Sequence, residues 1–145
     1  KELFHIPLFG PALARAGYVR IDRSNRKAAH KSLLAAAQKI ASGVSVIIFP
    51  EGSRSSDDQL KPFKPGGFHL ALRAERPIVP ISIYGTHQVL PKGSIYFKPG
   101  CVIVRIAPPV STTLFGKNGK NRLMREIRDI MQTDLARIKS RWTHH

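Results

Sequence analysis

Val44-Ser45-Val46-Ile47-Ile48-Phe49 is an apolar run rich in β-branched residues, and it stops at Pro50. A run of this kind is typical of a strand that is buried in a parallel sheet. Helical spacing precedes it, ending at Gly43, and returns at 66–76, after which a second apolar strand is expected at 78–84. Strands that alternate with helices predict an α/β fold with a mostly parallel central sheet flanked by helices.

Weaker signals predict the remaining elements. These are strands at 18–22, 95–97 and 101–106, a short helix near 11–16, and longer helices at 24–42 and 120–141. The last helix has an apolar stripe that we expect to be buried: Met124, Ile127, Met131, Leu135 and Ile138. The 145 residues suit a single domain, in which 111–145 form a C-terminal helical extension.

Charge is the unusual feature of the composition. The chain has 24 Lys and Arg against 9 Asp and Glu, a formal net charge of +15. So basic a domain is expected to meet an anionic partner, such as phosphate groups, an acidic membrane surface or nucleic acid. The aromatic residues lack the spacing of a base-stacking platform, which makes a nucleic-acid-binding module the weaker alternative.

Several motifs of other protein classes are missing. The sequence has no phosphate-binding Gly-rich loop, no dinucleotide-binding turn and no serine-hydrolase nucleophile elbow. No His, Asp or Glu cluster has the spacing of metal ligands, and the single Cys101 excludes an internal disulfide. Nucleotide-binding, serine-hydrolase and metal-dependent classes therefore lose support, and no metal site is expected.

Charged residues follow two of the predicted strands. Arg23 comes directly after the strand at 18–22, and Arg54 lies in the loop after the strand at 44–49. Because ligands bind beyond the carboxyl ends of strands in open parallel sheets, the two arginines are expected to converge on one groove. Two guanidinium groups suit a phosphate monoester, since each can donate two parallel hydrogen bonds. Gly52 would let the backbone pass close to the ligand, and Lys64 would add positive charge at the rim.

Three segments, in order, resemble blocks of the glycerolipid acyltransferases, the family of the lysophosphatidic acid acyltransferases. Phe49-Pro50-Glu51-Gly52-Ser53-Arg54-Ser55 is similar to the family's Phe-Pro-Glu-Gly-Thr/Ser-Arg-Ser block. Residues 17–23, which end in Ile-Asp-Arg, resemble its second block, and Ile78-Val79-Pro80-Ile81 resembles its fourth. The resemblance extends over roughly residues 1–110.

The resemblance implies acyl transfer from acyl-CoA or acyl-acyl carrier protein to the free hydroxyl of 1-acyl-sn-glycerol-3-phosphate, giving phosphatidic acid without a cofactor. In this family the histidine of a His-x-x-x-x-Asp block acts as general base, and the aspartate orients it. No histidine of this chain has an aspartate five positions later. The catalytic pair is therefore expected upstream of Lys1, the domain is expected to be incomplete at its N-terminus, and we expect the isolated chain not to turn over.

The resemblance also implies which residues contact the substrates. The acceptor phosphate would be bound by Arg23, Glu51, Gly52, Ser53, Arg54 and Lys64. The acyl or acceptor side would be formed by Ile78, Val79 and Pro80.

The resemblance places the protein at an anionic membrane surface, on the cytoplasmic face of a bacterial inner membrane, with acyl carrier protein as a candidate partner and no nucleic acid. Besides the nucleic-acid-binding module, two alternatives remain: the same chemistry on glycerol-3-phosphate or another lysolipid, and a non-catalytic lipid-binding relative.

Overall fold

The computed structural model describes residues 35–55, 59–91, 93–116 and 118–142. The chain forms two compact units, Lys1–Val46 and Ile47–His145. The predicted strand at 18–22, the predicted helix at 11–16 and Arg23 lie outside the described residues.

The described part of the first unit contains the end of a helix, at 35–41. Ala36 and Ala37 are both buried. The helix stops at Gly43, whose φ of +102° is easily adopted only by glycine. The N–H of Val44 then donates back to the carbonyl oxygen of Lys39, at 3.1 Å. The predicted C-terminal end of the 24–42 helix is thus confirmed.

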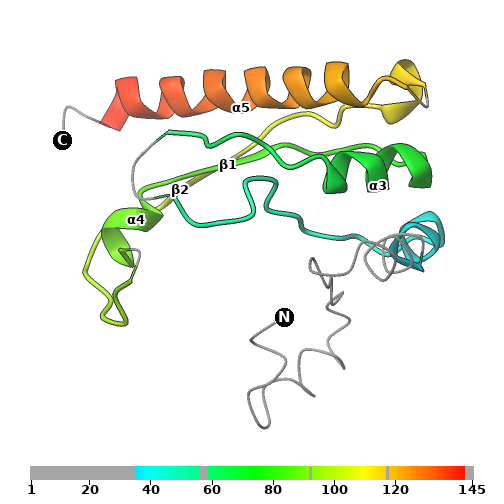
Figure 1. Cartoon of the computed structure of the whole chain (residues 1–145). Helices are drawn as coiled ribbons and strands as arrows, with labels where there is room; N and C mark the ends of the chain where they lie inside the picture. The colour runs from blue at the N-terminus through cyan, green and yellow to red at the C-terminus, as the bar shows by residue number, and fades with distance from the viewer. Residues whose placement is uncertain (1–34, 56–58, 92, 117, 143–145) are drawn as a thin grey trace, which may run out of the picture. The chain divides into compact units, whose positions relative to one another are not determined.

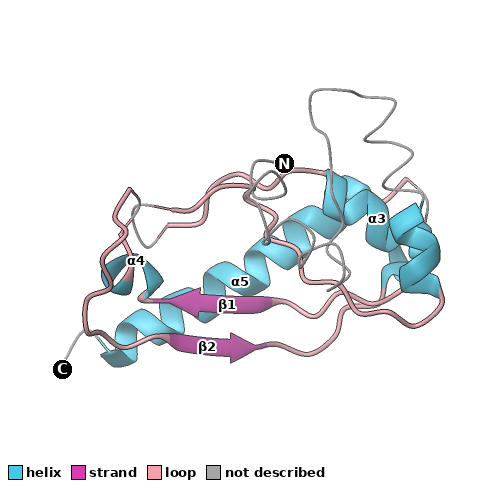
Figure 2. Cartoon of the chain, turned by 90° about the horizontal axis from the view of Figure 1, so that it is seen from below, coloured by secondary structure: helices cyan, strands magenta, loops and turns pink. Residues whose placement is uncertain are grey.

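The second unit contains all the other described helices and strands. In chain order they are α3 (Gly66–Ala74), β1 (Ile81–Tyr84), α4 (Thr86–Val89), β2 (Ile103–Ile106), the 3-10 turn η2 (Thr112–Phe115) and α5 (Lys120–Trp142). Two layers result, because α5 runs across one face of the β1–β2 sheet (Figures 1 and 2). The predicted helices at 66–76 and 120–141 are confirmed to within two residues.

The described sheet is antiparallel. β1 and β2 pair from Ile81↔Ile106 to Tyr84↔Ile103, and an isolated bridge, Ile78↔Val110, continues the pairing. The chain between the two strands stays at one end of them, so β2 returns beside β1 in the opposite direction (Figure 2). A parallel pair would need a crossover along the length of the sheet. The mostly parallel sheet is therefore not found among the described residues.

Two predicted strands are absent from the described chain. Residues 44–49 form no strand, and Ile47 and Phe49 are 80% and 73% exposed. A strand needs an adjacent backbone for its N–H and C=O groups, and no described strand pairs with this run. Residues 95–97 also form an exposed loop instead of a strand.

Strand β1 is buried on one face only. Ser82 is 1% exposed, whereas Ile81 and Ile83 lie on the opposite face and are exposed. One face of this strand is open among the described residues, because only one described layer, α5, covers the sheet.

The core of this unit lies where α5 meets α3 and η2. Its buried members are Phe68, Phe115, Leu123 and Ile127. The predicted stripe of α5 is right at Ile127 and Ile138, while Met124, Met131 and Leu135 are only partly buried. The helix is rotated so that Leu123 and Asp134 take the central buried positions.

Candidate functional site

The segment between Pro50 and Lys64, which follows the exposed run at 44–49, forms a loop whose two ends are joined. We call it the Arg54 loop. The N–H of Lys64 donates to the carbonyl oxygen of Pro50 at 2.7 Å, which joins the two ends of the loop. Gly52 closes the turn 49–52 at the start of this loop, with a φ of +71° and an N–H that donates to the carbonyl oxygen of Phe49 at 3.1 Å. A side chain at this glycine would strain the backbone, so the Glu-Gly-Ser-Arg order has a direct conformational cause.

Lys61 stabilises this loop through two hydrogen bonds to other residues of the loop. Its backbone N–H donates to a carboxylate oxygen of Glu51 at 3.0 Å. Its Nζ donates to the carbonyl oxygen of Arg54 at 2.8 Å. Glu51 and Lys61 thus fix the backbone on either side of Arg54.

Arg54 itself is exposed. Its guanidinium group has no hydrogen-bond or ion-pair partner among the residues that the structure describes. The side chains of Ser53 and Lys64, from the same loop, are exposed as well. An arginine held by its backbone while its side chain stays unpaired is well placed to receive an anion. Its predicted convergence with Arg23 involves a residue outside the described part and stays a prediction.

Residues 78–80 differ in their accessibility. Ile78 packs on the core and exchanges two backbone hydrogen bonds with Val110, at 2.9 and 2.8 Å. Pro80 is buried, and its carbonyl oxygen accepts from the N–H of Ala107 at 3.0 Å. Val79 is exposed. Of the predicted acyl-side residues, Val79 is therefore the one whose side chain is open to a ligand.

Arg128 of α5 is a residue of this site that the sequence reasoning missed. Its two terminal nitrogens donate to the carbonyl oxygens of Lys61 and Leu60, at 2.7 and 2.8 Å. Its guanidinium carbon lies 5.4 Å from the centre of the Phe63 ring, and that ring stacks on Phe68 of α3 at 5.9 Å. The Arg54 loop is thus clamped onto the helical layer. From the sequence alone, Arg128 is expected only to face solvent or an anionic surface.

Comparison with known proteins identifies the family of this chain. Residues 1–84, more than half of the chain, match the family model described as Acyltransferase. The chain belongs to the acyltransferase family. The matched part of this acyltransferase chain contains the Arg54 loop, α3 and β1, and it ends before β2 and α5.

Several relatives of this acyltransferase chain have the same name. It is 43% identical over 113 residues to the 1-acyl-sn-glycerol-3-phosphate acyltransferase of Limnanthes alba, covering 77% of this chain and 40% of the relative. It is 34% identical over 139 residues to the enzyme of that name from Escherichia coli, covering 95% of this chain and 56% of the relative. The chain thus spans about half the length of the relatives it matches.

The fold of this acyltransferase chain is also similar to a solved structure. The crystal structure of the 1-acyl-sn-glycerophosphate (LPA) acyltransferase PlsC from Thermotoga maritima is 31% identical, with a TM-score of 0.82. The match covers 97% of this chain and 55% of that one.

The described histidines of the acyltransferase chain do not form a catalytic pair. Desolvation, and then the positive charges of Lys120 and Arg73, lower the pKa of His69 below its usual value. Within the described ranges no cluster of three or more His, Cys, Asp or Glu side chains could hold a metal ion. None of the described helices is both long and apolar enough to cross a membrane.

Proposed function

We propose that the full-length protein containing this chain transfers an acyl group from an acyl thioester to the free hydroxyl of 1-acyl-sn-glycerol-3-phosphate. The hydroxyl oxygen attacks the thioester carbonyl carbon, the C–S bond breaks, and the hydroxyl proton leaves with the thiol. The products are phosphatidic acid and the free thiol. The observation that best supports this is the exposed Arg54 guanidinium, which has no partner among the described residues and whose backbone carbonyl is held by Lys61, in a chain whose relatives have the name of this activity.

Recognition of the acceptor phosphate is assigned to Arg54 together with Arg23, Ser53 and Lys64. The guanidinium groups supply paired donors, and the hydroxyl and ammonium groups supply single donors. Gly52 lets the backbone approach. Glu51 acts through the loop, because its carboxylate already accepts from the N–H of Lys61 and would repel a phosphate.

The general base is assigned to a His-x-x-x-x-Asp pair outside these 145 residues, since none of the six histidines of the chain belongs to such a pair. The acyl chain is assigned to the side of residues 78–80, where Val79 and the outer face of β1 are apolar and exposed. The donor is acyl-CoA or acyl-acyl carrier protein, no cofactor takes part, and the protein works on the cytoplasmic face of a bacterial inner membrane without binding nucleic acid.

Thiol release from an acyl thioester by the full-length protein tests this function. Four acceptors are compared: 1-acyl-sn-glycerol-3-phosphate, the phosphate-free monoacylglycerol, glycerol-3-phosphate and lysophosphatidylcholine. Release is expected with the first, and at least ten times more slowly with the others. Equal rates with monoacylglycerol, or no release with any acceptor, would contradict the proposal.

Replacing Arg128 by methionine is expected to raise the KM for the lysophospholipid acceptor about tenfold and to leave the KM for the thioester within twofold. The change removes two hydrogen bonds from a charged donor, each commonly worth about 1.5–3 kcal/mol, and loosens the loop that presents Arg54. Steady-state kinetics with each substrate varied in turn measures both constants.

Two variants separate this positioning role from general damage. Arg128→Lys retains one donor and is expected to recover part of the acceptor affinity. Arg125→Met, on the exposed side of the same helix, is expected to change neither constant. Equal rises in both KM values of Arg128→Met would show that the residue only stabilises the fold.

A further inference from the structure

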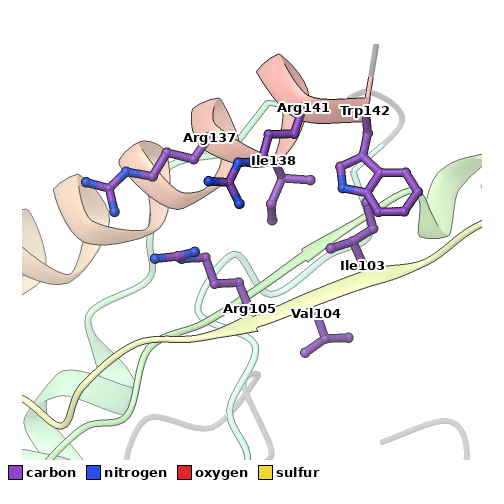
Figure 3. A pocket seen from close by; sticks show the side chains of 7 residues that line it. All are labelled: Ile103, Val104, Arg105, Arg137, Ile138, Arg141 and Trp142. Atoms are coloured by element: carbon purple, nitrogen blue, oxygen red, sulfur yellow. The ribbon is translucent and has the colours of Figure 1, made fainter. Parts of the chain in front are cut away.

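A pocket of about 420 Å³ lies between the C-terminal end of α5 and β2. This volume falls within the roughly 300–1,000 Å³ of small-molecule sites. Three arginines line it, Arg105 from β2 and Arg137 and Arg141 from α5. Their guanidinium groups extend toward the same side of the pocket, while Trp142 borders the other side (Figure 3).

Positive charge in this pocket exceeds negative charge. The Nε of Arg105 pairs with a carboxylate oxygen of Asp134 at 2.6 Å. Asp134 is buried, and its other carboxylate oxygen has no hydrogen-bond partner among the described residues. Arg137 and Arg141 are exposed, and no described residue forms an ion pair with them. Among the described residues, one carboxylate faces three guanidinium groups, so positive charge is in excess there.

The rest of the lining is apolar. Ile103 and Ile138 contribute aliphatic surface, and Trp142, at the rim, is 49% exposed. Tryptophan beside arginine is the combination that suits a membrane–water interface, where the indole ring rests among the headgroups and the cation meets their phosphates. A duplex nucleic acid would be met by a stripe of charge, whereas these three arginines line a single concave pocket.

We propose that this pocket binds the phosphate headgroup of an anionic phospholipid and docks the end of α5 on the membrane surface. The site deepens the proposed function, because an enzyme whose acceptor is a lysophospholipid must work at such a surface. It is separate from the acceptor site. Arg137 lies nine residues beyond Arg128, the residue that clamps the Arg54 loop, which is roughly 14 Å along the helix axis.

The test uses vesicles and the 145-residue chain, whose only tryptophan is Trp142. Fluorescence of that ring is recorded with vesicles of pure phosphatidylcholine and with vesicles containing phosphatidylglycerol. A blue shift is expected with the anionic vesicles only. No shift with anionic vesicles would overturn the proposal.

Binding of variants to the anionic vesicles by flotation locates the site. Arg137→Gln with Arg141→Gln is expected to weaken partitioning about 25-fold, at about fivefold for each arginine. Arg73→Gln with Arg125→Gln removes the same charge from exposed positions outside the pocket and is expected to cost less than fivefold. Equal losses in the two double variants would overturn the proposal, and circular dichroism checks that both are folded.

Competition distinguishes a lipid-borne phosphate from other anions. Inorganic phosphate at millimolar concentration and duplex DNA are added to the vesicle-bound chain, and neither is expected to reverse the blue shift. Full reversal by either would overturn the assignment to a phospholipid. None of these measurements needs acyl transfer, so an inactive full-length protein would contradict the proposed reaction and leave this site standing.

Discussion

Replacing Arg54 by alanine in the full-length protein is expected to lower kcat/KM for 1-acyl-sn-glycerol-3-phosphate by about 100-fold. Hydrogen bonds from a charged donor are worth about 1.5–3 kcal/mol, and each 1.4 kcal/mol is a factor of ten. The guanidinium of Arg54 has no partner among the described residues, so its removal is not expected to unfold the loop. Nearly all of the loss should therefore concern the substrate.

Two comparisons make this result specific. Arg54→Lys keeps the charge without the planar pair of donors, and is expected to recover only part of the activity. Arg73→Ala removes an exposed arginine of α3 and is expected to leave kcat/KM unchanged. If Arg54→Ala slowed transfer to monoacylglycerol as much as to its phosphorylated counterpart, the phosphate role of Arg54 would be excluded.

The second large effect is expected in the core. Leu123→Ala should lower the free energy of unfolding by about 2–5 kcal/mol, since Leu123 is fully buried and its truncation leaves a cavity between α5, α3 and η2. Urea unfolding followed by circular dichroism measures the change. Leu114→Ala is the matched control, because Leu114 is 72% exposed and should cost less than about 0.5 kcal/mol.

A small effect of Leu123→Ala would mean that the helical layer is loosely packed. The cluster also contains Phe68, whose ring stacks on Phe63, the residue beneath Arg128. Damage to the core is therefore expected to raise the acceptor KM as well. An unchanged acceptor KM in Leu123→Ala would show that the core only stabilises the fold, whereas a raised KM would show that it also supports the Arg54 loop.

The helices were largely predictable, whereas the sheet was not. Helical periodicity and a stopping glycine or proline are local signals, and they placed α3 and α5 within two residues. Strand direction depends on where the chain returns, and nothing in an apolar run such as 78–84 encodes that. The buried face of α5 also differs from the prediction, because it includes Asp134. This carboxylate pairs with Arg105, which lies 29 residues away in the sequence, and helical periodicity does not reveal such a pairing.

The site was predictable where its residues are contiguous. The Glu-Gly-Ser-Arg order identified the loop, and its turn at Gly52 follows from glycine's conformational freedom. The contacts of Arg128 with Lys61 and Leu60 join positions 67 and 68 residues apart, which no local pattern links. The convergence of Arg23 with Arg54 concerns a residue outside the described part, and it remains a prediction.

The contact between Arg128 and the loop has a practical consequence for protein engineering. The segment that matches the acyltransferase family ends at residue 84, whereas the arginine that clamps its loop is at 128. A hybrid enzyme that took residues 1–84 from one relative and the remainder from another would combine the Arg54 loop of one protein with the α5 helix of the other. The contacts between Arg128 and the loop would then be made by residues from two different proteins. Substrate preference should therefore be transferable between relatives only when the motif segment and α5 are exchanged together.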